Sequence, residues 1–504
     1  MLSFSTVCVS LIALISSVSA IVLDVNRRES IINATALLAH GVQELYNGNQ
    51  TGGTIGKWPY KPYYWWESGG AWGGMMEYWH ATKDESYTNV MMEALVSQLG
   101  PNYDFDRPEE AFDTGNDDQA FWVFVALAAA EYGFPPPPGP APGWHMIAQN
   151  AWNDYVYRWN TTMCGGGLKW QFHPENAGFF YKNSISNGAF FQVSARLARF
   201  TGNQTYIDWA EKIWDWVENI GLMSSTYDIY DGTDELINCS AVDHHQWTYN
   251  VGVFLYGAAT LANCTNNSQI WVDRTTGLLA ATGSFFTPFP NATNILFEAA
   301  CELQSSCNTD QWSMKAYLAR WMAASSVVAP YIKDRVTTLL RASALGAASA
   351  CTRGGYGNTC GSKWYIDGYD NITGLGQQLS ALEVMTSLLI LNDSVAPRTL
   401  PHVSIPNLPP HAVPTAIVVE ANPASTARPL HDPPPNGVSE KDTATLPDDS
   451  VPDPPPNTTP TTVAATANPT SATNPLHDPP PNGVSKKDTA KYGGLLVGLA
   501  HVLL

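Results

Sequence analysis

The sequence predicts an all-α fold, a closed (α/α)6 barrel of helical hairpins over residues 21–395, followed by a disordered Pro/Thr/Ser-rich stalk. Apolar residues recur in the first part at helical spacing, and almost no stretch alternates as a β-strand does. The helical runs come in pairs joined by short polar turns, and we count about twelve or thirteen of them. About six hairpins account for this number, which favours a closed ring over an open solenoid, since the hairpins share no consensus sequence.

The hairpins can be followed in order along the chain. The first pair surrounds the turn TKDES, and the pair over residues 184–223 surrounds the turn TGNQ, where Asn203 is placed as a helix cap. The turn NCTNNS divides the next pair, and Pro330 separates the two runs that follow. A last run over residues 371–392 closes the predicted domain.

Residues 1–20 are expected to be a signal peptide. The segment is a short apolar run that ends in the small residues Val18-Ser19-Ala20, although no Lys or Arg precedes it. It is too short to span a membrane. Eleven Asn-x-Ser/Thr sequons agree with export and predict a glycosylated surface. They are Asn33, Asn49, Asn160, Asn203, Asn238, Asn263, Asn266, Asn291, Asn371, Asn392 and Asn457.

Seven cysteines remain once Cys8 leaves with the signal peptide, and an oxidising compartment favours disulfides between them. Their spacing suggests two local bridges, and a longer bridge would leave one cysteine odd. The cysteines concerned are Cys301–Cys307 and Cys351–Cys360 locally, Cys164–Cys239 at longer range, and Cys264 as the odd one. No Cys or His cluster has convincing metal-ligand spacing, so we expect neither a metal nor a cofactor.

The C-terminal part is rich in Pro, Thr, Ser and Asn and lacks the apolar residues for a core. Residues 421–444 recur as residues 467–490, so residues 396–482 are expected to form an O-glycosylated stalk with a duplication of period 46. Residues 483–504 end in a short apolar tail, which matches a GPI-attachment signal with Asn482 as the anchor site and Gly483 as the alternative. A GPI anchor predicts a protein of the cell surface, held at the plasma membrane or in the cell wall. A plain secreted form is the alternative.

The formal charge of −19, from 45 acidic against 26 basic residues, argues against a nucleic-acid partner. It is compatible with a secreted protein, expected to be a monomer, that acts on neutral or cationic material.

Eighteen tryptophans stand mostly near Gly or acidic residues. Exposed aromatic rings serve as platforms for sugars, and packing in the core is the alternative for each of them.

The stretch DTGNDDQAFW, residues 113–122, places Asp117 and Asp118 side by side before an apolar helical run. A helix start favours acids, but one acid suffices and a second adds repulsion. Two close carboxyls have their pKa values pushed apart, which is the split between nucleophile and acid that glycoside hydrolysis requires. Neighbours at a helix start project their carboxyls about 5–6 Å apart, near the separation of a retaining mechanism. Helix capping and catalysis both remain open on these residues alone.

Longer stretches decide between the two. Eight stretches, which together span roughly residues 25–392, carry a family resemblance. They are YYWWESGGAWGGMMEYWHATKDESY, GNDDQAFW, CGGGLKWQ, NSISNGAFFQVSARLARFTGNQTY, YDGTDELINC, WTYNVGVFLYGAATL, CELQSSCNTDQWSMKAYLARW and DGYDNITGLGQQLSALEVM. They resemble the fungal branch of glycoside hydrolase family 76, the endo-α-1,6-mannanases and their wall-assembly relatives. The resemblance implies an (α/α)6 barrel, with Asp117 as nucleophile and Asp118 as general acid/base.

The resemblance also implies a further functional carboxylate at Asp231 in YDG, which would position the sugar; a turn Asp before Gly is the alternative. Aromatic and amide side chains near helix starts are candidates for lining a substrate groove, with core packing as the rival interpretation. They are Trp66, Trp122, Trp247, Tyr249 and Asn250.

Three functions compete on the sequence. The first is a retaining endo-α-1,6-mannosidase that acts on mannan at the cell surface and serves cell-wall assembly. The second is a transglycosylase that moves GPI-anchored mannoproteins, through their GPI glycan, onto a β-glucan acceptor of the wall. The third is an inactive mannan-binding surface protein, against which the intact NDDQ argues.

Overall fold

The computed structural model describes residues 21–400, apart from 112–113, 355–356 and 393–396. This part contains twelve α-helices, with short 3₁₀-helices and short strands between them. The α-helices are α1 (Arg28–Glu44), α2 (Trp65–Thr82), α3 (Thr88–Ser97), α4 (Asn116–Tyr132), α5 (Trp144–Arg158), α6 (Ser184–Thr201), α7 (Gln204–Asn219), α8 (Thr248–Cys264), α9 (Gln269–Ala281), α10 (Met314–Val328), α11 (Lys333–Ala350) and α12 (Leu375–Asn392). The 3₁₀-helices are η1 (Pro108–Glu110), η2 (Glu235–Ile237), η3 (Thr282–Phe285), η4 (Gln311–Ser313) and η5 (Pro330–Ile332).

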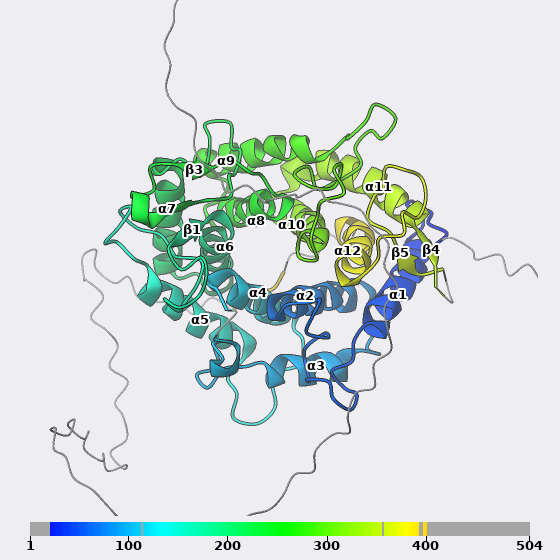
Figure 1. Cartoon of the computed structure of the whole chain (residues 1–504), viewed down its shortest axis with the longest axis horizontal. Helices are drawn as coiled ribbons and strands as arrows, with labels where there is room; N and C mark the ends of the chain where they lie inside the picture. Colours follow the sequence, from blue (N-terminus) through cyan, green and yellow to red (C-terminus); the bar gives the residue numbers. More distant parts are fainter. Residues whose placement is uncertain (1–20, 112–113, 355–356, 393–396, 401–504) are drawn as a thin grey trace, which may run out of the picture. The chain divides into compact units, whose positions relative to one another are not determined.

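The even-numbered helices form a closed inner ring. Each packs against the next from α2 to α12, and α12 packs back onto α2 (Figure 1). The odd-numbered helices lie outside this ring, each against an inner helix next to it in the chain, except that α1 packs mainly against α12. The predicted (α/α)6 barrel is therefore confirmed, and the open solenoid is wrong because the first and last inner helices are in contact.

Helix composition follows this layering. Between its first turn and Glu131, inner helix α4 is apolar on all sides, and almost every residue of it is buried. Outer helix α7 is amphipathic: it buries Ile213, Trp214 and Val217 and exposes Asp208 and Asp215. The hairpin pattern of the sequence is thus an alternation between a helix with apolar neighbours on every side and a helix with one face in water.

The stretch GGAWGG lies inside α2 and serves helix packing. A Cβ at Gly70 would stand 2.3 Å from the Tyr317 hydroxyl, and one at Gly73 would stand 2.3 Å from the Arg320 guanidinium. Both neighbours are side chains of α10, a helix that is not next to α2 in the ring, so these glycines make room for the long side chains that reach α2 from it.

Buried ion pairs connect helices of the inner ring. Arg196 of α6 donates from Nε to Glu131 Oε1 of α4 at 3.0 Å and from Nη2 to Oε2 at 2.8 Å. Arg320 of α10 pairs with Glu383 of α12 and donates to the carbonyl oxygen of Gly70 in α2 at 2.9 Å. Because these groups are buried, the loss of one partner leaves a charge without compensation.

Two small antiparallel sheets stand in the loops, and the sequence pattern did not predict them. One sheet has the order β1 (Tyr181–Asn183), β2 (Gly232–Asp234), β3 (Val242–Asp243), and the other pairs β4 (Cys351–Arg353) with β5 (Thr359–Cys360). In the first sheet Tyr181 is opposite Asp234, and Asn183 is opposite Gly232. This register brings the loop before β2 next to the start of α6.

The structure forms both expected local disulfides and the longer one. They are Cys301–Cys307, Cys351–Cys360 and Cys164–Cys239, with Cys264 left as a half-buried free thiol. Nine of the sequon asparagines in the described residues are exposed, and Asn160 is half-buried. Their glycosylation stays a prediction, and Asn457 lies outside the described residues.

The last described residues, 397–400, lie at the end of the ring where the inner helices terminate. The Arg398 amide donates to the carbonyl oxygen of Glu131 at 2.9 Å, and the Leu400 amide donates to that of Phe200 at 2.8 Å. Residues 397–400, expected at the start of the stalk, thus hydrogen-bond to the last turns of α4 and α6.

The other predicted segments lie outside the described residues. They are the signal peptide 1–20, the stalk from residue 401, the GPI signal 483–504 and the anchor site Asn482. Within residues 21–400, gaps aside, no helix combines the length and the apolar character that a membrane crossing requires.

The Arg196–Glu131 pair gives a stability prediction. Arg196→Met leaves the Glu131 carboxylate buried and unpaired, so the free energy of unfolding should fall by about 3–5 kcal/mol in urea titration. The double variant Arg196→Met, Glu131→Leu should recover much of this loss, because it removes both charges. A single variant within about 0.5 kcal/mol of wild type, as for a neutral surface change, would contradict this role for the pair.

Candidate active site

Asp117 and Asp118, the acid pair, stand in the first turn of α4, with Gly115 as the N-cap residue. Each is only 9% exposed. The positive end of the helix dipole favours negative charge at this position. The Asn116 amide donates to the carbonyl oxygen of Trp170 at 2.8 Å, which ties the helix start to the loop before β1. The pair is therefore both a helix start and a buried, fixed arrangement of two carboxyls.

A cavity of about 190 Å³, the acid-pair cavity, opens on these carboxyls. Its walls come from the starts of the four inner helices α2, α4, α8 and α10, from the first small sheet and from the loops beside them, which is why residues distant in sequence meet there. The lining residues are Trp66, Asp117, Asp118, Phe121, Trp170, Tyr181, Asn183, Asp231, Tyr249, Asp310 and Met314.

Both Asp117 oxygens accept hydrogen bonds. Asn183 Nδ2 donates to Asp117 Oδ2 at 3.2 Å, and the Asp118 amide donates to Asp117 Oδ1 at 3.0 Å. Burial raises the pKa of Asp117, and the hydrogen bond from Asn183 opposes that rise. Since donors face both of its oxygens, Asp117 is the member of the pair that is better prepared to ionise.

Asp118 has the opposite balance. The Gly115 amide donates to Asp118 Oδ2 at 2.6 Å, and the two carboxyls hydrogen-bond to each other. Burial, and then the negative charge of Asp117, raise the pKa of Asp118 well above its ordinary value. One proton therefore belongs on Asp118 while Asp117 carries the charge.

Asp231 precedes β2, and its carboxyl faces the same cavity. The Tyr181 hydroxyl donates to Asp231 Oδ2 at 2.6 Å. Burial raises the pKa of Asp231, while hydrogen bonds from Tyr181 and from Trp247 lower it. The pairing of β1 with β2 holds the Asp231 carboxyl at the cavity. Asp231 is therefore a residue of the site as well as the residue before Gly232.

The structure brings five of the eight sequence-predicted site residues to the cavity lining: Asp117, Asp118, Trp66, Asp231 and Tyr249. Trp247 is not in the lining, but its side chain hydrogen-bonds to Asp231, which is. The remaining two do not reach the lining and are described next.

Trp122 is fully buried and stacks on Trp65 at 5.4 Å and on Phe105 at 5.8 Å between ring centroids. No face of its ring is available to a sugar, so the structure gives it the rival role, core packing. Asn250 is also fully buried one turn into α8, and its side-chain atoms have no hydrogen-bond partner among the described residues.

Sequence reasoning missed Tyr181, Asn183 and Asp310. Asn183 carries a recognisable signal, because its Oδ1 accepts the Ser186 amide as the N-cap of α6. Asp310 stands just before η4, and Trp66 donates a hydrogen bond to its carboxyl. Burial raises the pKa of Asp310 to about 6. No local pattern distinguishes Asp310 from other acids before a helix.

A second cavity of about 360 Å³, the adjoining cavity, shares four residues with the first. The shared residues are Trp66, Asp118, Trp170 and Asp310, and those belonging to the adjoining cavity alone are Tyr64, Gln171, Asn176 and Ala177. No Lys, Arg or His stands among the described residues that line either cavity. The described residues also contain no group of three or more His, Cys, Asp or Glu arranged to hold a metal ion.

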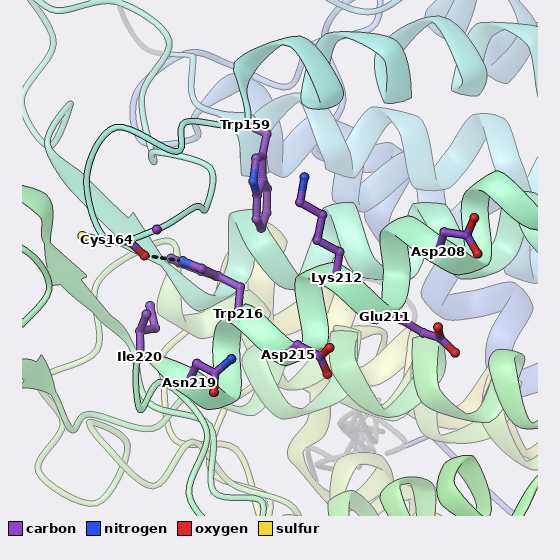
Figure 2. Close-up of a pocket in the computed structure, with 10 residues that line it drawn as sticks. Trp159, Cys164, Asp208, Glu211, Lys212, Asp215, Trp216, Asn219 and Ile220 are labelled. Atoms are coloured by element: carbon purple, nitrogen blue, oxygen red, sulfur yellow. Dashed lines mark hydrogen bonds between the residues drawn. The ribbon is translucent and has the colours of Figure 1, made fainter. Parts of the chain in front are cut away.

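A wider depression of about 650 Å³ runs along outer helix α7 (Figure 2). Asp208, Glu211 and Asp215 are exposed along this helix, and Lys212 Nζ lies 5.2 Å from the centre of the Trp159 ring. These acids are solvated and spread along one helix face, so the depression lacks the buried carboxyl pair that the acid-pair cavity contains.

A closed ring of helical hairpins with two buried, adjacent carboxyls at the helix starts defines a glycoside hydrolase of the (α/α)6-barrel class. The chain belongs to glycosyl hydrolase family 76, which it matches over residues 30–400. The family resemblance seen in the sequence is thereby confirmed.

The similar proteins include fungal enzymes. The chain is 44% identical over 384 residues to mannan endo-1,6-alpha-mannosidase DCW1 of Candida glabrata, covering 76% of this chain and 84% of that protein. It is 38% identical over 394 residues to mannan endo-1,6-alpha-mannosidase DFG5 of Saccharomyces cerevisiae, covering 78% and 85%.

Two solved structures share the fold. The crystal structure of Dfg5 from Chaetomium thermophilum in complex with glucosamine has a TM-score of 0.71 and 38% identity, covering 75% of this chain and 94% of that one. An inactive variant of the α-1,6-mannanase GH76A of Salegentibacter sp. HEL1_6, with two consecutive aspartates replaced, was solved with α-1,6-mannotetrose. It has a TM-score of 0.56 and 16% identity, covering 72% of this chain and 99% of that one, and this likeness concerns the fold.

Asn183 allows a test of how the site holds Asp117. Asn183→Ser keeps a helix-capping oxygen but loses the donor to Asp117, so stability should change little. Loss of a hydrogen bond to a charged group, worth about 1.5–3 kcal/mol, should lower kcat/KM by about 10–100-fold. The pKa of Asp117 should rise, moving the acid limb of the pH–rate profile upward. An unchanged acid limb would show that Asn183 only caps α6.

Proposed function

We propose that this protein is a retaining endo-α-1,6-mannosidase that acts on mannan chains of the cell surface. The observation that carries the proposal is the buried acid pair, with one member prepared to ionise and the other to hold a proton. The fungal relatives named mannan endo-1,6-alpha-mannosidase support the substrate and its linkage. The acid-pair cavity is lined by aromatic rings and hydrogen-bonding groups without cations, which suits a neutral sugar.

In the first step the Asp117 carboxylate attacks C1 of the mannosyl residue that occupies the acid-pair cavity. The bond from C1 to the glycosidic oxygen breaks, and Asp118 gives its proton to that oxygen as the leaving chain departs. The product is a mannosyl ester on Asp117. Carboxyls of adjacent residues at a helix start stand about 5–6 Å apart, close to the separation of a retaining pair, which favours this course over inversion.

In the second step Asp118, now ionised, takes the proton of an incoming hydroxyl. Its oxygen bonds to C1, and the ester to Asp117 breaks. Throughout both steps Asp231, held by Tyr181, can accept a hydrogen bond from a hydroxyl of the bound sugar. Water as the incoming hydroxyl gives hydrolysis, and a sugar gives transfer.

Transfer is the second candidate function. The Dfg5 relative, which is 38% identical, was solved with glucosamine, an amino sugar, and the cavities of this chain contain acids without cations. That charge balance is compatible with a donor that carries an ammonium group, as a GPI glycan with an unsubstituted amino sugar does. In this case the protein would pass GPI-anchored mannoproteins to a wall glucan. The intact, paired acids support either enzyme over an inactive binding protein.

The predicted leader, stalk and GPI signal support a place at the cell surface for either activity, anchored to the plasma membrane or in the wall. We propose this localisation with Asn482 as the attachment residue. Asn482→Gln, combined with loss of Gly483, should release the protein from membranes into the medium, as measured by cell fractionation. Retention on the membrane would place the anchor elsewhere.

The direct test uses the purified protein with linear α-1,6-mannotetraose, with and without a β-glucan oligosaccharide, and product masses as the readout. Asp118→Asn should lower the rate by about 10²–10⁴-fold, and Asp117→Asn should lower it at least as much. Asp228→Asn, an acid outside both cavities, is the matched control and should leave the rate unchanged. Shorter products indicate hydrolysis, and hybrid products indicate transfer. Full activity in both acid-pair variants would show that Asp117 and Asp118 only stabilise the start of α4 and are not catalytic.

The pH dependence follows from the pair. Activity needs Asp117 ionised, so it is lost as the pH falls through the raised pKa of Asp117. It also needs Asp118 protonated, so it is lost as the pH rises through the higher pKa of Asp118. For mannotetraose we expect a bell-shaped kcat/KM profile, displaced above the range of ordinary aspartates. A glycosyl fluoride should lose the alkaline limb, because fluoride leaves without a proton from Asp118. An alkaline limb that is the same for both substrates would assign it to another group.

A further inference from the structure

We propose that N-linked glycans surround the end of the ring where the inner helices begin, and that a long mannan chain reaches the acid pair across the one side of this end that has no glycan. That side is residues 98–111, between α3 and α4. The inference rests on the proposed function, and it adds the direction from which a polymeric substrate approaches. The starting observation is how the Asn-x-Ser/Thr sequons are distributed over the ring.

Each inner helix is preceded by a connection at the end of the ring where the acid pair lies, and these six segments are the mouth connections. In the sequence, five of them contain one sequon each, and the sixth, from α3 to α4, contains none. The five sequon residues are Asn49 before α2, Asn160 before α6, Asn238 before α8, Asn291 before α10 and Asn371 before α12. The other sequons of residues 21–400 lie in α1 or at the far ends of α6, α8 and α12.

The five sequons of the mouth connections can accept a glycan. Four of the asparagines are exposed, and Asn160 is half-buried. The Oδ1 atoms of Asn160 and Asn238 accept backbone amides, from Thr162 at 2.8 Å and from Cys164 at 2.9 Å. These bonds occupy the oxygen and leave Nδ2, the atom to which the sugar is joined. A glycan is bulky and hydrated, so each one keeps a second polymer away from its connection.

The side without a sequon is a fixed protein surface. Lys57, in the connection before α2, pairs with Glu110 at 2.7 Å. Arg158, the last residue of α5, pairs with Asp106 at 2.6 Å. Residues 98–111 are thus held on both sides, and a chain that passes over them meets a defined surface of protein.

The same segment borders the way from the acid pair to water. The acid-pair cavity continues past Asp118 into the adjoining cavity. Asn176, in the lining of the adjoining cavity, donates from Nδ2 to the carbonyl oxygen of Ala111 at 3.0 Å. Tyr64 and Ala177 of the same lining are exposed, so this cavity opens to water beside the α3–α4 connection. A mannan chain longer than the cavities therefore leaves the ring on the side that has no sequon.

This arrangement treats substrates differently according to their size. A disaccharide passes between neighbouring glycans, whereas a polymer needs a continuous path that no glycan crosses. One additional glycan on residues 98–111 should therefore exclude the polymer and admit the disaccharide.

The test adds a glycan to the free side. Glu109→Asn with Ala111→Thr creates a sequon at an exposed position, and the full-length protein is purified from a eukaryotic secretory host. The turnover of high-mass α-1,6-mannan should fall by about tenfold or more, whereas fluoride release from the glycosyl fluoride of α-1,6-mannobiose should change by less than about twofold. Treatment of this variant with an N-glycosidase should restore mannan turnover. A loss that persists after this treatment would belong to the substitutions rather than to the glycan, and would overturn the inference.

A matched variant adds a glycan elsewhere. Ala280→Asn completes a sequon with Thr282 on outer helix α9, where Ala280 is exposed. It should lower neither rate. A loss of mannan turnover equal to that of the first variant would show that any added glycan slows the enzyme, and would contradict a single path.

Glycopeptide masses report which sites are modified. All five mouth asparagines should carry a glycan in the wild type, and a largely unmodified one would open a second side and overturn the proposal. If the new sequon stays unmodified, Glu109→Cys coupled to a maleimide polyethylene glycol supplies the same bulk. Gln50→Cys, coupled in the same way beside Asn49, is its control and should leave mannan turnover unchanged.

The two substrates distinguish the possible failures. No turnover of either one by the wild type would refute the proposed function itself. Turnover of both by the wild type, with a mannan rate that the added bulk on residues 98–111 leaves unchanged, would overturn the present inference alone. Equal losses on mannan and on the glycosyl fluoride would do the same, because they would indicate damage to the site and not a blocked path.

Discussion

The structure depends on one constraint: two adjacent carboxyls are kept out of water at the start of a helix. Desolvation raises both pKa values, and repulsion within the pair raises that of Asp118 further. The cost is offset locally by donors from Gly115 and Asn183 and by the helix dipole. It is offset globally by a ring that turns the starts of the inner helices toward a single end. Without that closure, Asn183 of β1 and Tyr249 of α8 would have no reason to stand beside α4.

The ring has to be rigid for this arrangement to hold, and its interior is built accordingly. Buried pairs such as Arg196–Glu131 and Arg320–Glu383 join neighbouring inner helices, and glycines of α2 make room for long side chains of α10. Such pairs add little net stability over well-packed apolar groups, but they penalise any register that separates the partners. The catalytic end then needs only short loops and a small sheet to place its side chains.

Much of this could be predicted from the sequence. The helical hairpins, the closed ring, the short disulfides and the acid pair all depend on local patterns: helical periodicity, turn residues, cysteine spacing and two consecutive aspartates. The family resemblance added Asp231. The sequence could not separate a tryptophan in the core from one in a groove, because Trp66 and Trp122 both lie in the first two turns of an inner helix and only tertiary contacts distinguish them. Nor could it find Asp310 or Tyr181, since their roles exist only where α10 and β1 meet α4.

The path of residues 397–400 has a consequence for how the enzyme faces its surroundings. These residues bond to the last turns of α4 and α6, whereas the acids belong to the first turn of α4. A helix of this length separates the two ends by about 25 Å, at 1.5 Å per residue. Residues 397–400 therefore lie at the end of the ring opposite the acid pair, and this segment of the chain leaves the opening over the carboxyls uncovered.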